Sequence, residues 1–383
     1  MRILHTADWH LGKVLKGVDR LPEQRGVMAE IVAVAAAEGV DLVVVAGDLF
    51  ESGAPSPDAQ RLAWETLLAL RARGADVAVI AGNHDSPDAF DAVRPVFAAA
   101  GVTVLGRPAV PAAGGVVELR TARTGEAVRL ALLPFVSQRG VVRAGDLFGL
   151  DAAEATARYA ERVARLVARL CEDFRPDAVN VLAGHGTVTG ARFGGGEREA
   201  QSIFDYHLPA DLFPATASYV ALGHLHRTQE VPARSPAWYA GAPIAVDFGE
   251  ETATPGVLVI DATPGTPAKV RAVPLTSPRR LRTVTGTVAE VAAMAGDLDD
   301  ALVRVVVTEP ARAGLGDEVR TVLPGAVDIK VAAPELERPL PRVDRVGRRP
   351  DQLFHAYLAE RGIDDARLEA LFVDLYDGAV GTT

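Results

Sequence analysis

The chain has 383 residues, of which 49% are hydrophobic and 23% are charged, and its formal net charge is −10. This composition is that of an ordinary globular protein, and the length suffices for two domains or for one large domain with an appendage. The acidic balance excludes a protein that coats DNA through lysine and arginine, but not an enzyme whose metal ions offset the local negative charge.

No run approaches about 18 uninterrupted apolar residues, so the sequence predicts no membrane span. The first residues lead directly into a strand-like run, which indicates that no signal peptide is present. Cys171 is the only cysteine, and a disulfide framework therefore cannot form. These features predict a protein of the reducing cytoplasm.

Residues 1–275 alternate strand-like and helix-like segments, which favours a layered α/β fold whose helices cover the sheet. Apolar residues at three- and four-residue spacing predict helices over residues 26–38 and 59–73, and a further helical run covers residues 152–174. Residues 107–135 have the pattern of short antiparallel strands. Five other apolar runs are typical of buried strands, and they lie at residues 2–7, 41–46, 76–81, 178–183 and 219–222.

Each of these five runs is followed by a short motif that contains Asp, Asn or His. The motifs are Asp8-Trp9-His10, Gly47-Asp48, Gly82-Asn83-His84-Asp85, Gly184-His185 and Gly223-His224-Leu225-His226. In sheets of this kind, ligands bind just beyond the carboxyl ends of the strands. We therefore expect the five motifs to meet at one edge of a sheet and to build one metal site there.

The donor types at these positions indicate which metal the site would take. Carboxylate, amide and imidazole donors without a thiolate set suit octahedral divalent ions, Mn before Fe, Zn or Mg. Two such ions can clamp the attacking and leaving oxygens of a phosphate ester. Asp48 follows a middle strand and is well placed to bridge them, and seven ligands in all leave positions open for water and substrate.

A second unit follows, and we place it at residues 276–334. The pattern predicts strand, helix, strand, helix and strand at residues 281–287, 288–295, 301–308, 313–322 and 327–332. The unit contains no histidine and no motif of its own. It is either a domain that shapes access to the site or a stabilising appendage.

Residues 335–383 form the tail of the chain. A Pro- and Arg-rich linker covers residues 335–350, and two short helices are predicted at residues 353–361 and 365–376. The first helix carries Leu353, Phe354, Tyr357 and Leu358 on one face. Such a face often packs on its own domain, but after a long linker with little chain left to cover it we favour a partner surface.

The five motifs in this order resemble those of the calcineurin-like metallophosphoesterase superfamily. The resemblance implies a β-sandwich flanked by helices and two divalent metal ions. It implies a first metal held by Asp8, His10, Asp48 and His226, and a second held by Asp48, Asn83, His185 and His224. For His84 it implies contact with the scissile phosphate and assistance to the leaving oxygen, and we expect Asp85 to orient His84.

Residues 1–12, 47–53, 219–226 and 239–250 are further similar to the SbcD family of nucleases. This resemblance implies a DNA nuclease, exonucleolytic on duplex ends and endonucleolytic on hairpins or single strands, that works with an SbcC ATPase in repair and recombination. It also implies that residues 276–334 cap the site, that the tail helices bind the base of the SbcC coiled coil, and that the chain forms a homodimer and larger assemblies with SbcC. Mn(II) is the expected metal.

Two further groups of residues have candidate roles near the site. The Gly-rich loop 186–198 directly follows His185, and we assign substrate binding to its Arg192 and Arg198, although a plain surface loop would have the same composition. Asp247 and Glu250 would either support the site from behind its ligands or serve only the fold.

Two other functions are compatible with parts of this pattern. A small-molecule phosphodiesterase or phosphoprotein phosphatase on the same scaffold would need the same metal residues. The second unit, the tail and the segment Asp8-Trp9-His10-Leu11-Gly12 favour the nuclease over this alternative. A non-enzymatic scaffold of this fold would usually lack a ligand or the motif histidine His84, and all of these are present.

Overall fold

The structure is a computed structural model that describes residues 1–137, 159–195, 207–298 and 300–332, and in the tail residues 354–355, 357–359, 363, 365 and 367–372. Met1–Ala332 form one compact unit, and Ala333–Thr383 belong to a second one. Among the helices of these described residues, none is long and apolar enough to cross a membrane.

The first of two large sheets contains three of the five strands that precede a motif. Its strands are Arg2–Thr6 (β1), Leu42–Ala46 (β4), Asp76–Ile80 (β5), Val102–Leu105 (β6), Gly256–Asp261 (β13) and Lys269–Pro274 (β14). Their order is β14-β13-β1-β4-β5-β6, in which β1, β4, β5 and β6 run parallel and β13 and β14 antiparallel to their neighbours. The parallel strands are apolar almost throughout because both of their faces are covered.

The second large sheet contains the other two strands that precede a motif. Its strands are Val116–Arg120 (β7), Ala127–Leu133 (β8), Val179–His185 (β9), Tyr219–Gly223 (β10), Gln229–Val231 (β11) and Ala237–Tyr239 (β12). Their order is β11-β12-β10-β9-β8-β7, with the four central strands parallel. The pair β7 and β8 confirms the antiparallel strands predicted within residues 107–135.

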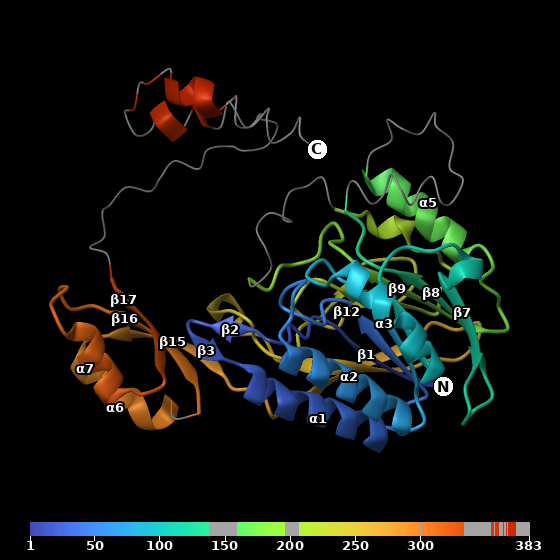
Figure 1. Cartoon of the computed structure of the whole chain (residues 1–383), viewed down its shortest axis with the longest axis horizontal. Helices are drawn as coiled ribbons and strands as arrows, with labels where there is room; N and C mark the ends of the chain where they lie inside the picture. The colour runs from blue at the N-terminus through green and yellow to red at the C-terminus, as the bar shows by residue number, and fades with distance from the viewer. Residues whose placement is uncertain are drawn as a thin grey trace. The chain divides into compact units, whose positions relative to one another are not determined.

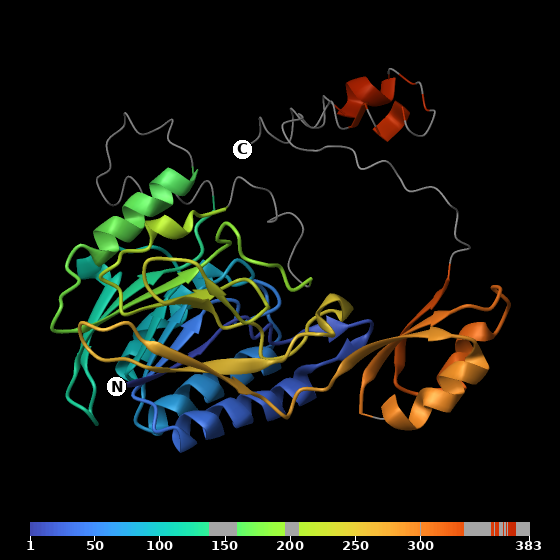
Figure 2. The same cartoon turned by 180° about the vertical axis from the view of Figure 1, so that it is seen from behind.

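The two sheets pack face to face between layers of helices. The helices are Leu21–Ala37 (α1), Pro57–Ala72 (α2), Pro87–Ala99 (α3) and Tyr159–Cys171 (α5). Helices α1 and α2 lie along one outer side of the sandwich and α5 along the other (Figures 1 and 2). One apolar core fills the space between the two sheets. A second core lies between the first sheet and helices α1 and α2, and a third lies between the second sheet and helix α5. The predicted α/β sandwich with flanking helices is therefore confirmed.

Several predicted boundaries change. Helix α1 begins at Leu21, five residues before the predicted start, with Pro22 in its first turn where proline is tolerated. Helix α3 was not predicted at all. Ser86 caps its N-terminus, and the Ser86 side chain accepts a hydrogen bond from the backbone N–H of Ala89. Helix α5 occupies part of the predicted run 152–174, of which residues 152–158 lie outside the described residues.

Residues 281–331 fold into a small sheet of their own. Its elements are Leu281–Gly286 (β15), Val288–Met294 (α6), Leu302–Val307 (β16), Leu315–Val322 (α7) and Ala326–Val331 (β17). The three strands are parallel in the order β15-β16-β17 (Figure 1). The five predicted elements are thus present, while the division of the chain into domains at residues 275 and 334 stays a prediction.

The remaining elements are short. They are the hairpin Val14–Leu15 (β2) and Val18–Asp19 (β3) and the 3-10 turns Pro111–Ala113 (η1), Ala210–Leu212 (η5), Phe248–Glu250 (η6) and Ala295–Leu298 (η7). In the tail, residues 354–355, 357–359 and 367–372 are helical. The rest of the linker and of the two predicted tail helices lies outside the described residues.

Candidate metal centre

The five motifs meet where the two sheets face each other. The expectation of one edge of one sheet is wrong, because β1, β4 and β5 belong to the first sheet whereas β9 and β10 belong to the second. Several hydrogen bonds join the sheets at this point, among them the following two. The His224 N–H donates to Asp8 Oδ1 at 2.9 Å, and His185 Nδ1 lies 2.7 Å from the carbonyl oxygen of Ala46.

The backbone is strained at four of the candidate ligands. The φ angles of Asp8, His10, Asp48 and His224 are 54°, 47°, 53° and 102°. Non-glycine residues rarely adopt this left-handed region, and such strain persists only where the surrounding structure enforces it. The four strained residues are all members of the two clusters described below.

Glycines next to the ligands allow the close approach. A Cβ built on Gly82 would lie 2.1 Å from Asp48 Oδ1, and one built on Gly223 would lie 2.0 Å from the Ala46 carbonyl oxygen. Both distances are far below any real Cβ contact. Gly82 and Gly223 are therefore required by packing, since a side chain at either position would displace Asp48 or separate the two sheets.

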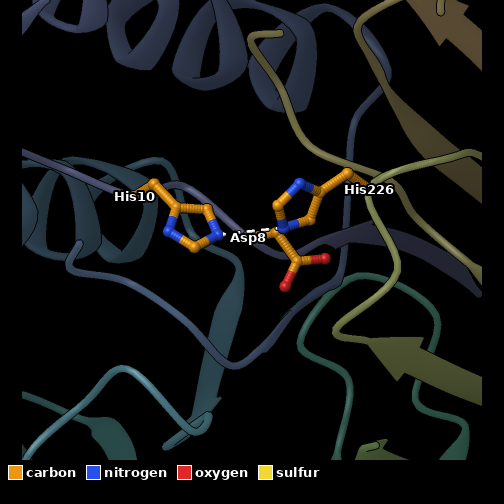
Figure 3. A group of neighbouring side chains, drawn as sticks. All are labelled: Asp8, His10 and His226. Carbon is orange, nitrogen blue, oxygen red and sulfur yellow. Dashed lines mark hydrogen bonds between the residues drawn. The ribbon is translucent and has the colours of Figure 1, made fainter. Parts of the chain in front are cut away.

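Asp8, His10 and His226 form the first cluster, and Figure 3 shows their side chains converging. Each offers a ligand atom within 4.8 Å of the other two, and the Nε2 atoms of His10 and His226 are 3.1 Å apart. The opposite nitrogen of each ring meets a carboxylate. His10 Nδ1 lies 3.0 Å from Glu51 Oε2, and His226 Nδ1 lies 2.6 Å from Glu250 Oε1.

This arrangement fits a bound cation. Burial lowers the pKa of His10 to about 4, although its hydrogen bond to Glu51 acts in the opposite direction, so the ring is neutral at pH 7. A neutral imidazole carries one proton, and the carboxylate that accepts it leaves a lone pair on the other nitrogen. When the two carboxylates accept the Nδ1 protons, the Nε2 atoms of His10 and His226 both present lone pairs to the same space, which a divalent ion would satisfy.

Asp48, His185 and His224 form the second cluster, again within 4.8 Å of one another. Asn83 Oδ1 lies 2.9 Å from His185 Nε2 and 2.8 Å from His224 Nδ1, so Asn83 belongs to this group as well. Burial disfavours a charged His185, but Asp48, helped by Asp8, raises the pKa of its ring to about 9. Positive charge is thus stabilised at this point, as a second metal position requires.

The two aspartates differ in their electrostatics. Burial raises the pKa of Asp8 to about 7, with His185 and His226 opposing the shift. Burial would also raise the pKa of Asp48, but His185 and then His10 and His84 lower it below its ordinary value. Asp48 faces ligands of both clusters, with Oδ2 3.5 Å from His185 Nε2 and 3.9 Å from His10 Nε2. The carboxylate of Asp48 therefore lies between ligand atoms of the two clusters.

His84 lies beside both clusters. Its backbone N–H donates to Asp48 Oδ1 at 2.8 Å, and its Nδ1 is 2.7 Å from the carbonyl oxygen of Glu51. Its ring meets that of His10 edge to face, with centroids 4.7 Å apart. When Nδ1 donates to the carbonyl, Nε2 is the nitrogen that can exchange a proton with a substrate.

Asp85 has a different role from the one expected. Its carboxylate accepts backbone N–H groups of Gly82, Leu49 and Phe50 at 2.9, 3.2 and 3.1 Å. The His84 ring is instead oriented by the Glu51 carbonyl. Asp85 therefore ties the loop after β5 to the loop after β4, because a carboxylate can accept several N–H groups at once and a ring nitrogen cannot. It is a positioning residue and not a catalytic one.

Two glutamates behind the ligands complete the centre. The sequence left Glu250 open between supporting the site and serving the fold, and its bond to His226 assigns it to the site. Glu51 was not predicted, although it lies in the strand-end segment that carries Asp48. Asp247 serves its own turn, where Oδ1 accepts the Gly249 N–H.

The two arginines to which the sequence assigns substrate binding, Arg192 and Arg198, are only partly described. Arg192 is exposed, and its backbone N–H donates to Gln229 Oε1 at 2.8 Å, so its side chain stays a candidate. Arg198 lies outside the described residues. The exposed Phe193 follows Arg192 in the same loop, its ring centroid 6.3 Å from that of His207.

The chain is similar to several known proteins. The family described as calcineurin-like phosphoesterase matches residues 1–228. The SbcD component of the nuclease SbcCD from Bacillus subtilis is 36% identical over 285 residues, which cover 73% of this chain and 71% of the relative. The SbcD components from Rhodobacter capsulatus and Escherichia coli K12 are 33% and 31% identical, covering 73% and 65% of this chain and 70% and 62% of the relatives. A solved dimetal phosphatase from Danio rerio matches with a TM-score of only 0.41 at 12% identity, covering 71% of this chain and 98% of its own.

Proposed function

Because the chain belongs to the calcineurin-like phosphoesterase family and, within it, to the family of the SbcD nucleases, we propose that it is a DNA nuclease. It hydrolyses phosphodiester bonds with two divalent metal ions, and Mn(II) is the metal proposed for both positions. It acts as an exonuclease on duplex ends and as an endonuclease on hairpins or single strands. Its setting is DNA repair and recombination, together with an SbcC ATPase.

One observation carries the proposal. Residues from five separate strand ends form two clusters, and Asp48 of the second cluster also faces His10 of the first. The first position would be held by Asp8, His10, Asp48 and His226, and the second by Asp48, Asn83, His185 and His224. All donors are oxygen or nitrogen atoms, which suits octahedral divalent ions. When bound, two such ions lower the pKa of a water and neutralise the charge that develops on the phosphate.

The chain's own residues supply the remaining chemistry. With Nδ1 donating to the Glu51 carbonyl, His84 in its doubly protonated form is proposed to donate the Nε2 proton to the leaving oxygen, which leaves the neutral ring. The Asp48 hydrogen bond to the His84 backbone fixes the distance between this acid and the shared carboxylate. Glu51 and Glu250 hold His10 and His226 in the tautomer that presents Nε2 to the centre.

Substrate selection is assigned to the surroundings of the centre. Arg192 and Arg198 of the loop after His185 would bind phosphates of the DNA backbone. Residues 276–334 would act as a capping domain that shapes access of DNA to the centre. The charge of this chain is negative overall, so local cations and bound metal, and not its net charge, would attract the substrate.

The tail is proposed as the SbcC-binding surface. Phe354 stacks on Phe372 with ring centroids 4.2 Å apart, so the two helical segments pack on each other. Tyr357, Leu368 and Leu371 stay exposed, at 46%, 39% and 52% of their surface. Exposed apolar side chains grouped on a small helical unit are typical of an interface. Tyr357→Asp with Leu371→Asp in the full chain should abolish co-elution with SbcC while nuclease activity of the isolated chain remains.

Oligomers are part of the same proposal. We infer a homodimer and a larger assembly with SbcC, which multi-angle light scattering of the chain alone and with SbcC measures directly. A monomer at every concentration would remove the dimer from the proposal without affecting the metal centre.

The central test is a cleavage assay with Mn(II) on end-labelled linear and hairpin DNA. The His84→Ala variant should retain Mn(II) but lose cleavage, and His355→Ala, on the exposed tail, is the matched control that should cut as the parent does. Rapid hydrolysis of bis-p-nitrophenyl phosphate without DNA cleavage, also with SbcC and ATP present, would instead favour a small-molecule phosphodiesterase. A parent chain that binds no Mn(II) and cuts neither substrate would favour a non-enzymatic scaffold.

A further inference from the structure

A short turn connects the metal centre to the small sheet of residues 281–331. The turn comprises Asp247 and the 3-10 segment Phe248–Glu250, η6, and is called the 247–250 turn below. At its end, Glu250 meets the ring of His226 at 2.6 Å. Two residues earlier, the ring of Phe248 lies under the guanidinium of Arg304, which is 4.4 Å from the ring centroid. Arg304 belongs to β16 of the small sheet.

The turn is braced internally, so its two contacts are mechanically linked. The Gly249 N–H donates to Asp247 Oδ1 at 3.0 Å, and the Glu250 N–H donates to the Asp247 carbonyl at 3.0 Å. The second oxygen of the Glu250 carboxylate accepts the Val246 N–H at 2.8 Å. Glu250 is only 2% exposed and has no room to re-orient alone. A displacement of Phe248 therefore displaces the carboxylate that holds His226.

The small sheet contacts the turn through a packed apolar cluster. Phe248 is 3% exposed and packs with Leu15 and Ala245, which precede the small sheet in the chain, and with Leu281 and Leu302 of the small sheet itself. This cluster couples the position of Phe248 to that of the small sheet, because packed side chains transmit displacement.

Arg304 is itself fixed within the small sheet. Its Nε donates to Asp328 Oδ2 at 2.8 Å, from the neighbouring strand β17. The position of the guanidinium above Phe248 consequently depends on both β16 and β17. A cation over an aromatic face adds attraction to the apolar packing, and the attraction is larger when the pair is withdrawn from water.

The opposite side of the turn meets the loop after His185. A Cβ built on Gly195 would lie 3.2 Å from the backbone of Gly249, and one built on Gly249 would lie 2.9 Å from the Gly195 carbonyl oxygen. The two glycines thus allow backbone to pack on backbone. The turn is therefore held between this loop and the small sheet. Because its Glu250 contacts the His226 ring, a shift of the turn would change the position of that ring.

We propose that Arg304 and Phe248 are positioning residues for His226, and that through Glu250 they tie the binding of an ion at the first metal position to the position of the small sheet. The inference rests on the proposed metal centre and deepens it. Contacts that move residues 281–331, such as DNA seated on them, then change the first metal position and leave the second unchanged. The 247–250 turn is the path, and no residue of the second position touches it among the contacts of the described residues.

The test measures Mn(II) binding by the full chain, from the paramagnetic resonance signal of free Mn(II) during titration. Arg304→Met removes the cation and keeps the length of the side chain, and it should weaken one of two Mn(II) sites by about two- to fivefold. Arg304→Lys restores the cation and should recover part of the loss. Arg312→Met is the matched control, since Arg312 pairs with Glu309 and Glu318 within the same unit, away from Phe248.

A second variant addresses the turn from its other side. Phe248→Leu keeps apolar packing but removes the aromatic face, and it should weaken the same Mn(II) site as Arg304→Met does. Combined with Arg304→Met it should add little, because both remove one contact. Circular dichroism and thermal melting verify that each variant is folded.

The outcomes separate this inference from the proposed function. If the parent binds two Mn(II) and Arg304→Met binds both as the parent does, the positioning role is wrong and the metal centre stands. If Arg304→Met and Arg312→Met weaken both sites equally, the effect is general loosening and the inference is likewise overturned. A parent without Mn(II) binding removes the proposed function, and the inference with it.

Discussion

The two proposed metal positions share Asp48 but are built from different groups. At the first, both histidines are backed by carboxylates, His10 by Glu51 and His226 by Glu250. At the second, His185 is backed by the neutral carbonyl of Ala46, and the uncharged amide of Asn83 stands where the first position has Asp8. The first position therefore concentrates negative charge that the second lacks.

This difference indicates how the centre divides its work. A carboxylate behind a histidine fixes the ring tautomer and makes the ligating nitrogen more basic, which strengthens metal binding. Fewer charged ligands weaken binding of a divalent ion. We expect a tightly held ion at the first position and a more readily exchanged one at the second. The first position is also the one that the 247–250 turn connects to residues 281–331.

Asp48→Asn should have the largest effect, because it removes the carboxylate that both positions share. We expect the rate of phosphodiester hydrolysis to fall by roughly 10³-fold, since several kcal/mol of charge stabilisation depend on both ions together. Steady-state rates on bis-p-nitrophenyl phosphate measure this directly. Both Mn(II) affinities should fall in the same variant, and a loss at only one position would contradict the bridging role of Asp48.

Glu250→Gln should separate the two positions. The amide oxygen can still accept a hydrogen bond from His226 Nδ1, but the negative charge behind the ring is lost. We expect the affinity of the first Mn(II) to fall by about 10- to 100-fold while the second is retained. Calorimetric titration resolves the two events. Glu251→Gln, the exposed neighbour, is the control, and equal weakening of both ions would refute the asymmetry.

Asn83→Asp should make the two positions more alike. The new carboxylate would face His185 and His224 from the place of the present amide oxygen, 2.9 and 2.8 Å from their nitrogens. One added negative charge should tighten the second Mn(II) by about tenfold. The same calorimetric titration measures the affinity of each Mn(II). Unchanged affinity at both positions would show that Asn83 does not ligate the ion.

Much of this centre could be predicted from the sequence because its residues stand directly after apolar runs. A buried strand is a local pattern, and the residue that follows it must lie at the sheet edge, so Asp8, Asp48 and His185 were identifiable. The division of the strands between two sheets was not predictable in this way. Pairing of β9 with β8 and β10, and not with β4, depends on contacts between residues far apart in the chain.

Other features leave no local signal. The left-handed backbone at Asp8 and His224 follows from the hydrogen bond between them across the sheets, which no spacing encodes. Asp85 was assigned to His84 by proximity in sequence, whereas the fold presents it with three backbone donors instead. Helix α3 went unpredicted because Pro95 stands inside it, and proline within a helix normally disfavours one.

The cap of helix α6 offers the contrasting case, because it lies within residues 281–331 but, in the part of the chain that the structure describes, makes no contact with Arg304 or Phe248, and its perturbation should leave both metal positions intact. Thr287 caps helix α6 in a capping box, in which its side chain accepts the Glu290 N–H while Glu290 accepts the Thr287 N–H at 2.7 Å. Thr287→Ala should destabilise this unit by about 1 kcal/mol. Thermal unfolding should show the loss, and Mn(II) titration should be unchanged, because the cap of α6 does not contact Arg304 or Phe248 among the contacts of the described residues. A coupled loss of Mn(II) affinity would mean that stability of the whole small sheet, and not the single contact at Phe248, controls the first metal position.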